Sequence, residues 1–242
     1  SRMKAKLDTG RSILYQTARY VDIYKALEDI VRDRTLTPEE RKEMKLYSRL
    51  ADAFTPLAKG MNSEYANQNA YDAISVHGGS GFIMEYKCQR LFRDARIFSI
   101  YEGTTQLQVV AAIRYVTNGT YLGIIKEMLE KEVAPEFQAL KDRVAKMVEK
   151  YEDAINYVKA AGNNDLHDFL ARRLYEMTAE IIMSLLILDD ATRAPELFAK
   201  SANVYVRYAE GTVAGHYAYI KEFKAEDLAD FLAAAPEEAP AE

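Results

Sequence analysis

The chain has 242 residues, 49% of them hydrophobic, which is enough to bury a core in one large or two small domains. Its net charge of −5 combines 32 basic with 37 acidic residues scattered along the sequence, which argues against nucleic acid as the main partner. No stretch approaches the roughly 20 apolar residues that span a bilayer, and the N-terminus lacks a signal-peptide layout, so we expect a soluble, cytoplasmic protein without a membrane span.

Helical periodicity dominates the first 76 residues. Apolar residues recur three or four apart, which predicts an all-α protein whose first helix covers about 3–34. Thr37, a following proline and Glu40 form a capping-box pattern, which predicts a second helix over about 38–76. Pro56 lies inside this second helix, where the missing backbone donor should kink or split it.

The next segment, residues 77–102, is rich in glycine and irregular in its apolar spacing. We expect a short helix over about 86–94 and a longer one over about 104–117. Asn118-Gly119 should end that helix, since both residues tolerate the left-handed conformation.

Two regular stripes follow. Apolar residues three and four apart over 137–158 and again over 166–185 predict helices that face a core, and Pro195 should begin another helix. Residues 233–242 are Ala, Pro and Glu only, a composition that cannot bury enough surface to order itself and so predicts a frayed tail.

The boundary between the two helical parts should fall near residue 118. We therefore expect three segments: a helical domain over 1–118 that carries the candidate site, a second helical bundle over 119–232, and a disordered tail over 233–242.

Gly78-Gly79-Ser80-Gly81 is the first candidate for ligand binding. Three glycines in four residues let the backbone turn sharply and bring its N–H groups close to a pyrophosphate. A loop that simply ends a helix has the same composition, and no predicted strand precedes the run as a Rossmann site requires.

Glu102-Gly103-Thr104 is the second candidate. Thr104 is a plausible N-cap for the helix that carries Gln106, in which case the run is an ordinary loop. Alternatively, Glu102 follows the apolar pair Ile100-Tyr101, where desolvation would raise its pKa toward that of a general base. The residues alone leave both interpretations open.

The joint order of three motifs carries more information than any one of them. His-Gly-Gly-Ser-Gly-Phe at 77–82 is followed by Gln-Arg-Leu-Phe-Arg-Asp-Ala-Arg at 89–96 and by Ile-Tyr-Glu-Gly-Thr-Thr-Gln at 100–106. This order resembles the C-terminal signature of the acyl-CoA dehydrogenases. The resemblance is dense over 69–114 and weaker over 1–68. It implies the C-terminal helical domain of that family, followed by the extra C-terminal helical domain of its longer members.

The resemblance implies a reaction. In this family FAD oxidises a saturated acyl-CoA to the trans-2-enoyl-CoA, as a carboxylate removes the α-proton and a hydride leaves the β-carbon for the flavin. Glu102 matches the position that most often supplies the base, although some members place it elsewhere. Tyr101 would line the acyl pocket beside it.

Cofactor contacts follow from the same resemblance. Thr104 and Gln106 match residues that help hold FAD. Gly78 and Gly79 match the turn that meets the dinucleotide, commonly that of a neighbouring subunit. Ser75 departs from the family, since many relatives have glutamine there, which puts one hydrogen bond to FAD in doubt.

The remaining reactive side chains have structural interpretations. The arginines around Asp94 are typical of structural ion pairs and carbonyl contacts. Cys88, the single cysteine, has no partner for a disulfide, and no histidine has metal-ligand companions in the sequence, so we propose no metal and expect a reducing compartment.

The resemblance also implies partners, namely an acyl-CoA substrate, an electron-transfer flavoprotein as electron acceptor and further copies of the chain in a homo-oligomer. The family's N-terminal helical and central β domains are not among these residues, so we expect the chain alone to hold no FAD and to be inactive. The alternative is a non-catalytic helical assembly or oligomerisation module that retains the motifs as structure. The part beyond Gly119 could pack on the core, form subunit contacts or alter access to the acyl pocket.

Overall fold

The computed structural model describes residues 1–231, whose regular secondary structure consists of helices. The predicted all-α class is confirmed; the predicted tail at 233–242 lies outside the described residues. The elements in chain order are α1 (Arg2–Asp33), α2 (Pro38–His77), α3 (Gly79–Phe82), α4 (Cys88–Ala95), η1 (Arg96–Ser99), α5 (Thr105–Thr117), α6 (Thr120–Glu130), η2 (Pro135–Phe137), α7 (Gln138–Ala160), α8 (Asn164–Arg193), α9 (Pro195–Glu222) and η3 (Ala225–Asp230).

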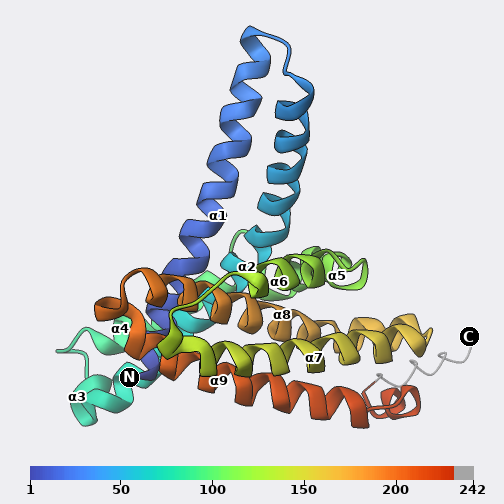
Figure 1. Ribbon diagram of the computed structural model, residues 1–242. Coiled ribbons are helices and arrows are strands. Elements are labelled where there is room, and N and C mark those ends of the chain that lie inside the picture. Colours follow the sequence, from blue (N-terminus) through green and yellow to red (C-terminus); the bar gives the residue numbers. More distant parts are fainter. Residues whose placement is uncertain (232–242) are drawn as a thin grey trace, which may run out of the picture.

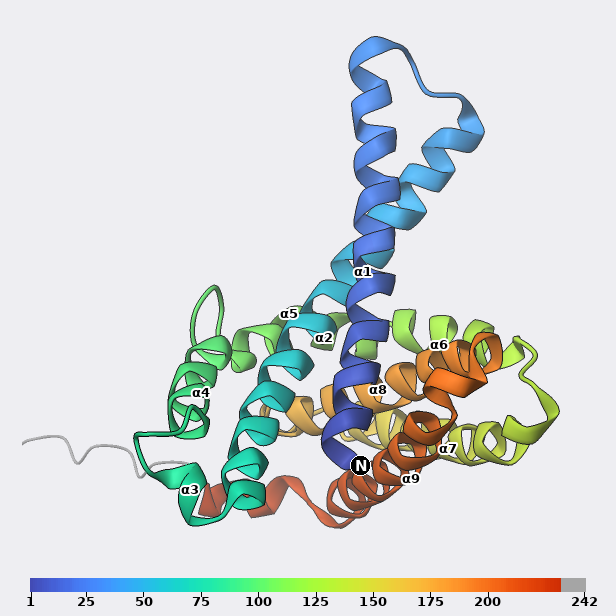
Figure 2. The ribbon, with the colours of Figure 1, turned by 90° about the vertical axis from the view of Figure 1, so that its left-hand side faces the viewer.

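The long helices α1 and α2 form an antiparallel hairpin whose connecting end extends away from the remaining helices (Figures 1 and 2). Helices α7, α8 and α9 pack side by side across the base of this hairpin (Figure 1). One buried apolar cluster runs through both parts: Ile13 and Leu57 of the hairpin belong to the same cluster as Leu174 of α8 and Val206 of α9. The hairpin is therefore anchored by a core that it shares with the second half of the chain.

The start of α2 confirms the predicted capping box. The Glu40 amide donates to Thr37 Oγ1 at 3.2 Å, and the Thr37 amide donates to Glu40 Oε2 at 2.9 Å. Arg34 adds two charge-assisted hydrogen bonds to the Glu40 carboxylate, of 2.8 and 2.6 Å. These contacts satisfy two amides that helix geometry leaves without partners.

Replacement of Thr37 by alanine removes one side of this cap. We expect the free energy of unfolding to fall by about 1 kcal/mol, measured by urea denaturation of the full chain followed by circular dichroism. Thr35→Ala is the matched control, because Thr35 is also exposed and lies outside the cap. Equal effects of the two substitutions would contradict a role for the capping box.

Of the two predicted effects of Pro56, a kink or a split, the split does not occur, because α2 continues from Pro38 to His77. Carbonyl groups near the proline find donors on other helices. The Tyr121 hydroxyl donates to the Ala53 carbonyl at 2.5 Å, and the Tyr175 hydroxyl donates to the Pro56 carbonyl at 2.9 Å. These two hydrogen bonds tie α2 to α6 and α8 close to the proline.

Gly119 ends α5 as predicted, with a φ of +80° that suits glycine. The Asn118 side chain accepts a 2.9 Å hydrogen bond from the Thr120 amide and so begins α6. Predicted and observed helix limits also agree at the Pro195 start of α9.

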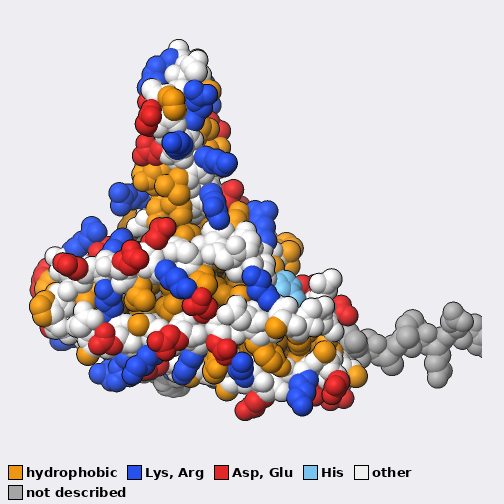
Figure 3. All heavy atoms as spheres, turned by 45° about the vertical axis from the view of Figure 1, so that its right-hand side comes forward, with side chains coloured by type: hydrophobic (Ala, Val, Ile, Leu, Met, Phe, Trp, Pro, Cys, Tyr) orange, Lys and Arg blue, Asp and Glu red, His pale blue; other side chains and the backbone are white. Residues whose placement is uncertain are grey.

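Acidic and basic side chains are interspersed over the face shown in Figure 3, and hydrophobic side chains gather where the hairpin joins the body. Among residues 1–231, no helix combines the length and apolar character needed to cross a membrane.

Candidate active-site groove

A groove of about 580 Å³ lies between α1, α2 and the loop that follows α4. This size is within the range of small-molecule sites. Its lining combines apolar, polar and basic side chains of the two helices with three residues of the segment that follows α4: Lys6, Leu7, Gly10, Arg11, Leu14 and Thr17 of α1, Thr55, Ala58, Lys59, Asn62, Ser63, Tyr65, Ala66 and Asn69 of α2, and Phe98, Tyr101 and Glu102.

Lys59 fixes the loop against α2. Its ammonium donates to the Phe98 carbonyl at 3.0 Å and to the Gly103 carbonyl at 2.5 Å. The same ammonium lies 5.9 Å from the centre of the Tyr101 ring, within the range of a cation–π contact. One side chain of α2 therefore holds both ends of the segment that carries Glu102.

Glu102 has a φ of +51° and is the one non-glycine residue with a positive φ in the described part of the chain. Gly103 follows with a φ of +93°. The left-handed region costs a non-glycine residue roughly 1–2 kcal/mol, and such strain concentrates at functional sites. The turn places the predicted base on the wall of the groove.

The surroundings of Glu102 differ from the sequence expectation. Its side chain is exposed, and its apolar neighbours Ile97, Phe98, Ile100 and Tyr101 are 42–50% exposed. Within the described residues, these neighbours do not shield the carboxylate from water. The loop presents an apolar surface outward rather than folding it around Glu102.

Two of the predicted cofactor residues lie directly after this loop. Thr104 is the N-cap of α5, and its side chain accepts a 3.3 Å hydrogen bond from the Leu107 amide. Gln106 is exposed in the first turn of α5. Neither residue lines the groove.

Gly78 and Gly79 lie farther away. They follow the C-terminal end of α2, nine positions beyond Asn69, which at the helical rise of about 1.5 Å per residue is about 14 Å. Both are exposed, Gly78 has a φ of +60°, and the position of a Cβ on either has no atom within 4 Å. The structure thus brings Tyr101 and Glu102 together in the groove and leaves the two glycines outside it.

The arginine-rich stretch forms α4 and η1. Arg90 and Asp94 make an exposed ion pair at 3.8 Å, and the Arg96 guanidinium donates to the Ser99 hydroxyl. Cys88 is a half-buried free thiol. These contacts agree with the structural interpretation of this stretch.

Sequence reasoning did not single out Lys59. The available signal was the polar and small-residue stripe at Thr55, Lys59, Asn62, Ala66 and Asn69, which shares one face of α2. Apolar spacing, which predicts helices, does not mark a polar stripe of this kind.

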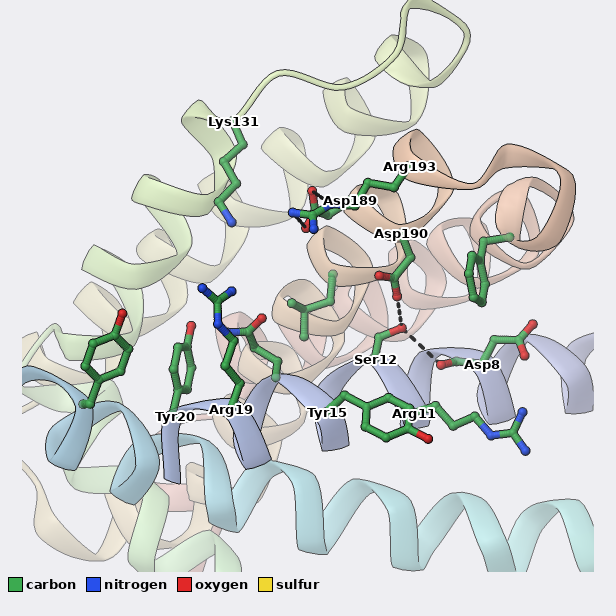
Figure 4. Close-up of a pocket in the computed structure, with 14 residues that line it drawn as sticks. Asp8, Arg11, Ser12, Tyr15, Arg19, Tyr20, Lys131, Asp189, Asp190 and Arg193 are labelled. Carbon is green, nitrogen blue, oxygen red and sulfur yellow. Dashed lines mark hydrogen bonds and ion pairs between the residues drawn. The ribbon is translucent and has the colours of Figure 1, made fainter. Parts of the chain in front are cut away.

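A second hollow, of about 630 Å³, lies between α1 and the end of α8 (Figure 4). Ser12 donates to Asp190 at 2.5 Å, and Arg193 pairs with Asp189 at 2.9 Å. Burial raises the pKa of Asp190, against the opposing effect of the Ser12 hydrogen bond. None of the site residues predicted from the sequence lines this hollow, so the groove beside Glu102 is the better candidate for the active site.

Comparisons with known proteins cover almost the whole chain. Residues 1–116 match the family described as "Acyl-CoA dehydrogenase, C-terminal domain", and residues 117–228 match "Acyl-CoA dehydrogenase C terminal". The chain is 28% identical over 203 residues to butyryl-CoA dehydrogenase of Syntrophomonas wolfei, covering 79% of the chain and 31% of the relative. It is 50% identical over 52 residues to the caffeyl-CoA reductase-Etf complex subunit CarC of Acetobacterium woodii, covering 22% of the chain and 14% of that subunit.

The matched part makes up 14–31% of the length of the curated relatives. Among solved structures, an acyl-CoA dehydrogenase complexed with FAD from Bacillus anthracis has the same fold, with a TM-score of 0.66, 19% identity and coverage of 95% of this chain and 42% of that one. Together with the two family matches, these findings establish that the chain belongs to the acyl-CoA dehydrogenase family and comprises its C-terminal helical domains.

Proposed function

We propose that this chain is the C-terminal part of an FAD-dependent enzyme that oxidises acyl-CoA to trans-2-enoyl-CoA, with Glu102 as the general base. The observation that carries the proposal is the position of Glu102 on the groove wall, beside Tyr101 and in a strained backbone conformation. A carboxylate at the wall of a groove with apolar sides can take a proton from the α-carbon of an acyl chain bound there.

Each residue of the groove would have its own role in binding or catalysis. Leu7 and Leu14 of α1 and Ala58 of α2 contribute apolar surface for the acyl chain. Tyr101 bounds the pocket beside the base, and Lys59 holds the loop so that the carboxylate keeps its place. Positioning of this kind supports catalysis because misplacement of the base by about 1 Å can cost roughly 10²-fold in rate.

We propose that FAD contacts the four residues that the family resemblance implies, Gly78, Gly79, Thr104 and Gln106. Gly78 and Gly79 leave open space where side chains would stand, and Gln106 is exposed at the start of α5. Thr104 uses its oxygen as an acceptor in the helix cap, which leaves its hydroxyl hydrogen available to a ligand. When bound, FAD would accept the hydride from the β-carbon. Ser75, exposed in the last turn of α2, is too short to replace the family's glutamine.

Closure of the site would come from outside the described residues. Because Glu102 is exposed here, we propose that flavin, substrate and the rest of the enzyme cover it and so make it a stronger base. The short matched share of the curated relatives supports this, since most of their length corresponds to other parts of an enzyme.

Contacts with other subunits are proposed for residues 76–101. This segment exposes an unusual number of large apolar side chains, a property of interaction surfaces: Val76, Phe82, Ile83, Met84, Tyr86, Leu91, Phe92, Ile97, Phe98, Ile100 and Tyr101. A homo-oligomer in the cytoplasm would bury them. Electron-transfer flavoprotein is the proposed acceptor, in keeping with the relative named as a subunit of an Etf complex.

The alternative function is a helical assembly module without catalysis, for which the shared core of the two halves and the exposed apolar segment would suffice. Anaerobic titration of the full-length protein with saturated acyl-CoA separates the two. An enzyme is expected to lose the visible absorbance of its oxidised flavin as the flavin accepts the hydride, and to form enoyl-CoA detected by mass spectrometry. Absence of both changes with short, medium and long acyl chains would favour the assembly module.

A separate prediction concerns flavin binding and activity of the isolated chain. Purified residues 1–242 are expected to show no flavin absorbance and no dehydrogenase activity, because the groove leaves Glu102 exposed and the glycine turn open on one side. Absorption spectra and a dye-reduction assay check this. A yellow preparation with one FAD per chain would contradict it.

A further inference from the structure

A buried polar cluster lies behind the groove, where four helices meet. Glu180 of α8 is 2% exposed, and its Oε1 accepts a 2.8 Å hydrogen bond from the Tyr65 hydroxyl of α2. The Tyr65 hydroxyl lies 2.7 Å from the Tyr205 hydroxyl of α9. The second carboxyl oxygen, Oε2, has no hydrogen-bond partner among the described residues. A fully buried carboxyl with an unsatisfied oxygen is costly, so its presence at this position needs an explanation.

Tyr65 connects this cluster to the groove. Its side chain is 4% exposed and lines the groove, while its hydroxyl is bonded to Glu180 on the side of the C-terminal helices. Lys6 of α1 also lines the groove, and its ammonium lies 4.9 Å from the centre of the Tyr65 ring and 4.8 Å from that of Tyr208. The Glu180 carboxyl is therefore one hydrogen bond away from a residue of the groove wall.

We propose that Glu180 is a positioning residue for the acyl ligand, which sets the groove wall through Tyr65 and weakens ligand binding when it is ionised. This inference rests on the proposed function, since it takes the groove as the acyl site. The second half of the chain would then control substrate affinity through a carboxyl group that does not touch the substrate.

The groups around Glu180 determine when it ionises. They come from every helix packed on it: Lys6 from α1, Tyr65 from α2, Glu176 on α8 itself, and Tyr205 and Tyr208 from α9. Burial is the largest effect and raises the pKa of Glu180 to about 7, although the hydrogen bonds to the two tyrosines and the charge of Lys6 act in the opposite direction. Burial also lowers the pKa of Lys6.

Ionisation changes the charge behind the wall. The Tyr65 hydroxyl can donate to Oε1 in both states, because the proton of a neutral carboxyl can lie on the unpartnered Oε2, so ionisation places a negative charge at the end of an unchanged hydrogen bond. A charge close to an apolar surface also disfavours the removal of water that accompanies acyl binding. Affinity is therefore expected to fall as the pH rises through about 7.

The test measures kcat and KM of the full-length enzyme between about pH 6 and about pH 8, the range around the pKa of Glu180. In the wild type, KM for acyl-CoA is expected to rise about three- to tenfold over this range, which corresponds to a change of at most about 1.4 kcal/mol in binding. Because the glutamine of Glu180→Gln cannot ionise, the rise of KM with pH should be absent in this variant, and kcat should change little. The exposed Glu149 of α7 supplies the matched control, since Glu149→Gln should keep the wild-type profile.

Tyr65→Phe is a second variant that tests the role of Glu180, because it keeps the ring in the groove wall and removes the hydrogen bond to Glu180. This variant should also flatten the dependence of KM on pH, and it provides the test if Glu180→Gln does not fold. Wild-type KM profiles in both variants, or an effect confined to kcat, would overturn the inference. Absence of acyl-CoA oxidation in the wild type would instead contradict the proposed function, so the two failures are distinguishable.

Stability gives a readout that needs no activity. Because the pKa of Glu180 is raised in the folded state, the unfolded chain loses this proton first as the pH rises from the ordinary value of 4.5. The denaturation midpoint of the wild type should therefore fall relative to that of Glu180→Gln between pH 4.5 and about 7, and the difference should level off above that pH. A constant difference over this range would show that Glu180 does not hold its proton in the folded protein.

Discussion

Glu102→Gln in the full-length enzyme is expected to lower the rate of acyl-CoA oxidation by about 10²- to 10⁴-fold, the usual contribution of a general base. Glutamine has nearly the same shape and can occupy the same left-handed backbone position, but it cannot accept the α-proton. Lys59 holds the carbonyls of Phe98 and Gly103, which the substitution leaves intact, so the loop should keep its conformation.

The accompanying measurements distinguish a chemical from a structural role. Flavin content and acyl-CoA affinity, followed by absorption spectroscopy, should stay near the wild-type values. Glu85→Gln is the matched control, because Glu85 is also an exposed acid in the 77–102 segment but does not line the groove. Unchanged turnover in Glu102→Gln would place the base elsewhere in the enzyme, whereas loss of flavin would point to a structural role for the carboxylate.

Helix limits could be predicted closely from the sequence because caps are local. The bonds between Thr37 and Glu40 and the left-handed turn at Gly119 involve neighbours in the chain, so their residue types suffice to locate them. The effect of Pro56 was not predictable in the same way. Donors for the carbonyls around it come from Tyr121 and Tyr175, which are distant in sequence.

The candidate site was also predictable only where its features are local in sequence. Motif order predicted Glu102 and Tyr101 as site residues, and both line the groove. Exposure of the surrounding apolar side chains could not be inferred, because it depends on what packs against them rather than on their type. Glu180 carried an unused signal, a carboxylate within the apolar run of α8, but its partner Tyr65 is 115 positions away and no periodicity pairs them.

Gly60→Ala is expected to destabilise the protein, although alanine is the better helix former. A Cβ at Gly60 would lie 2.1 Å from the Tyr175 hydroxyl oxygen and 3.2 Å from the ring carbon that carries it. Tyr175 is 1% exposed, and its hydroxyl is bonded to the Pro56 carbonyl, so it cannot move aside without losing that bond. Overpacking of this kind costs about 1–3 kcal/mol in free energy of unfolding, and over most of this range the cost exceeds the gain of about 1 kcal/mol in helix propensity.

Urea denaturation of the full chain, with Gly123→Ala as the matched control, measures this balance. Gly123 lies within α6, where a Cβ meets no atom within 4 Å, so its replacement should raise stability by up to about 1 kcal/mol. Adding Tyr175→Phe to Gly60→Ala should recover part of the loss by removing the nearest contact. If Gly60→Ala instead raised stability as Gly123→Ala does, α2 and α8 would not be as close as they are here. Because Gly60 adjoins Lys59, which holds the loop of Glu102, a displacement of α2 should also lower the activity of the whole enzyme.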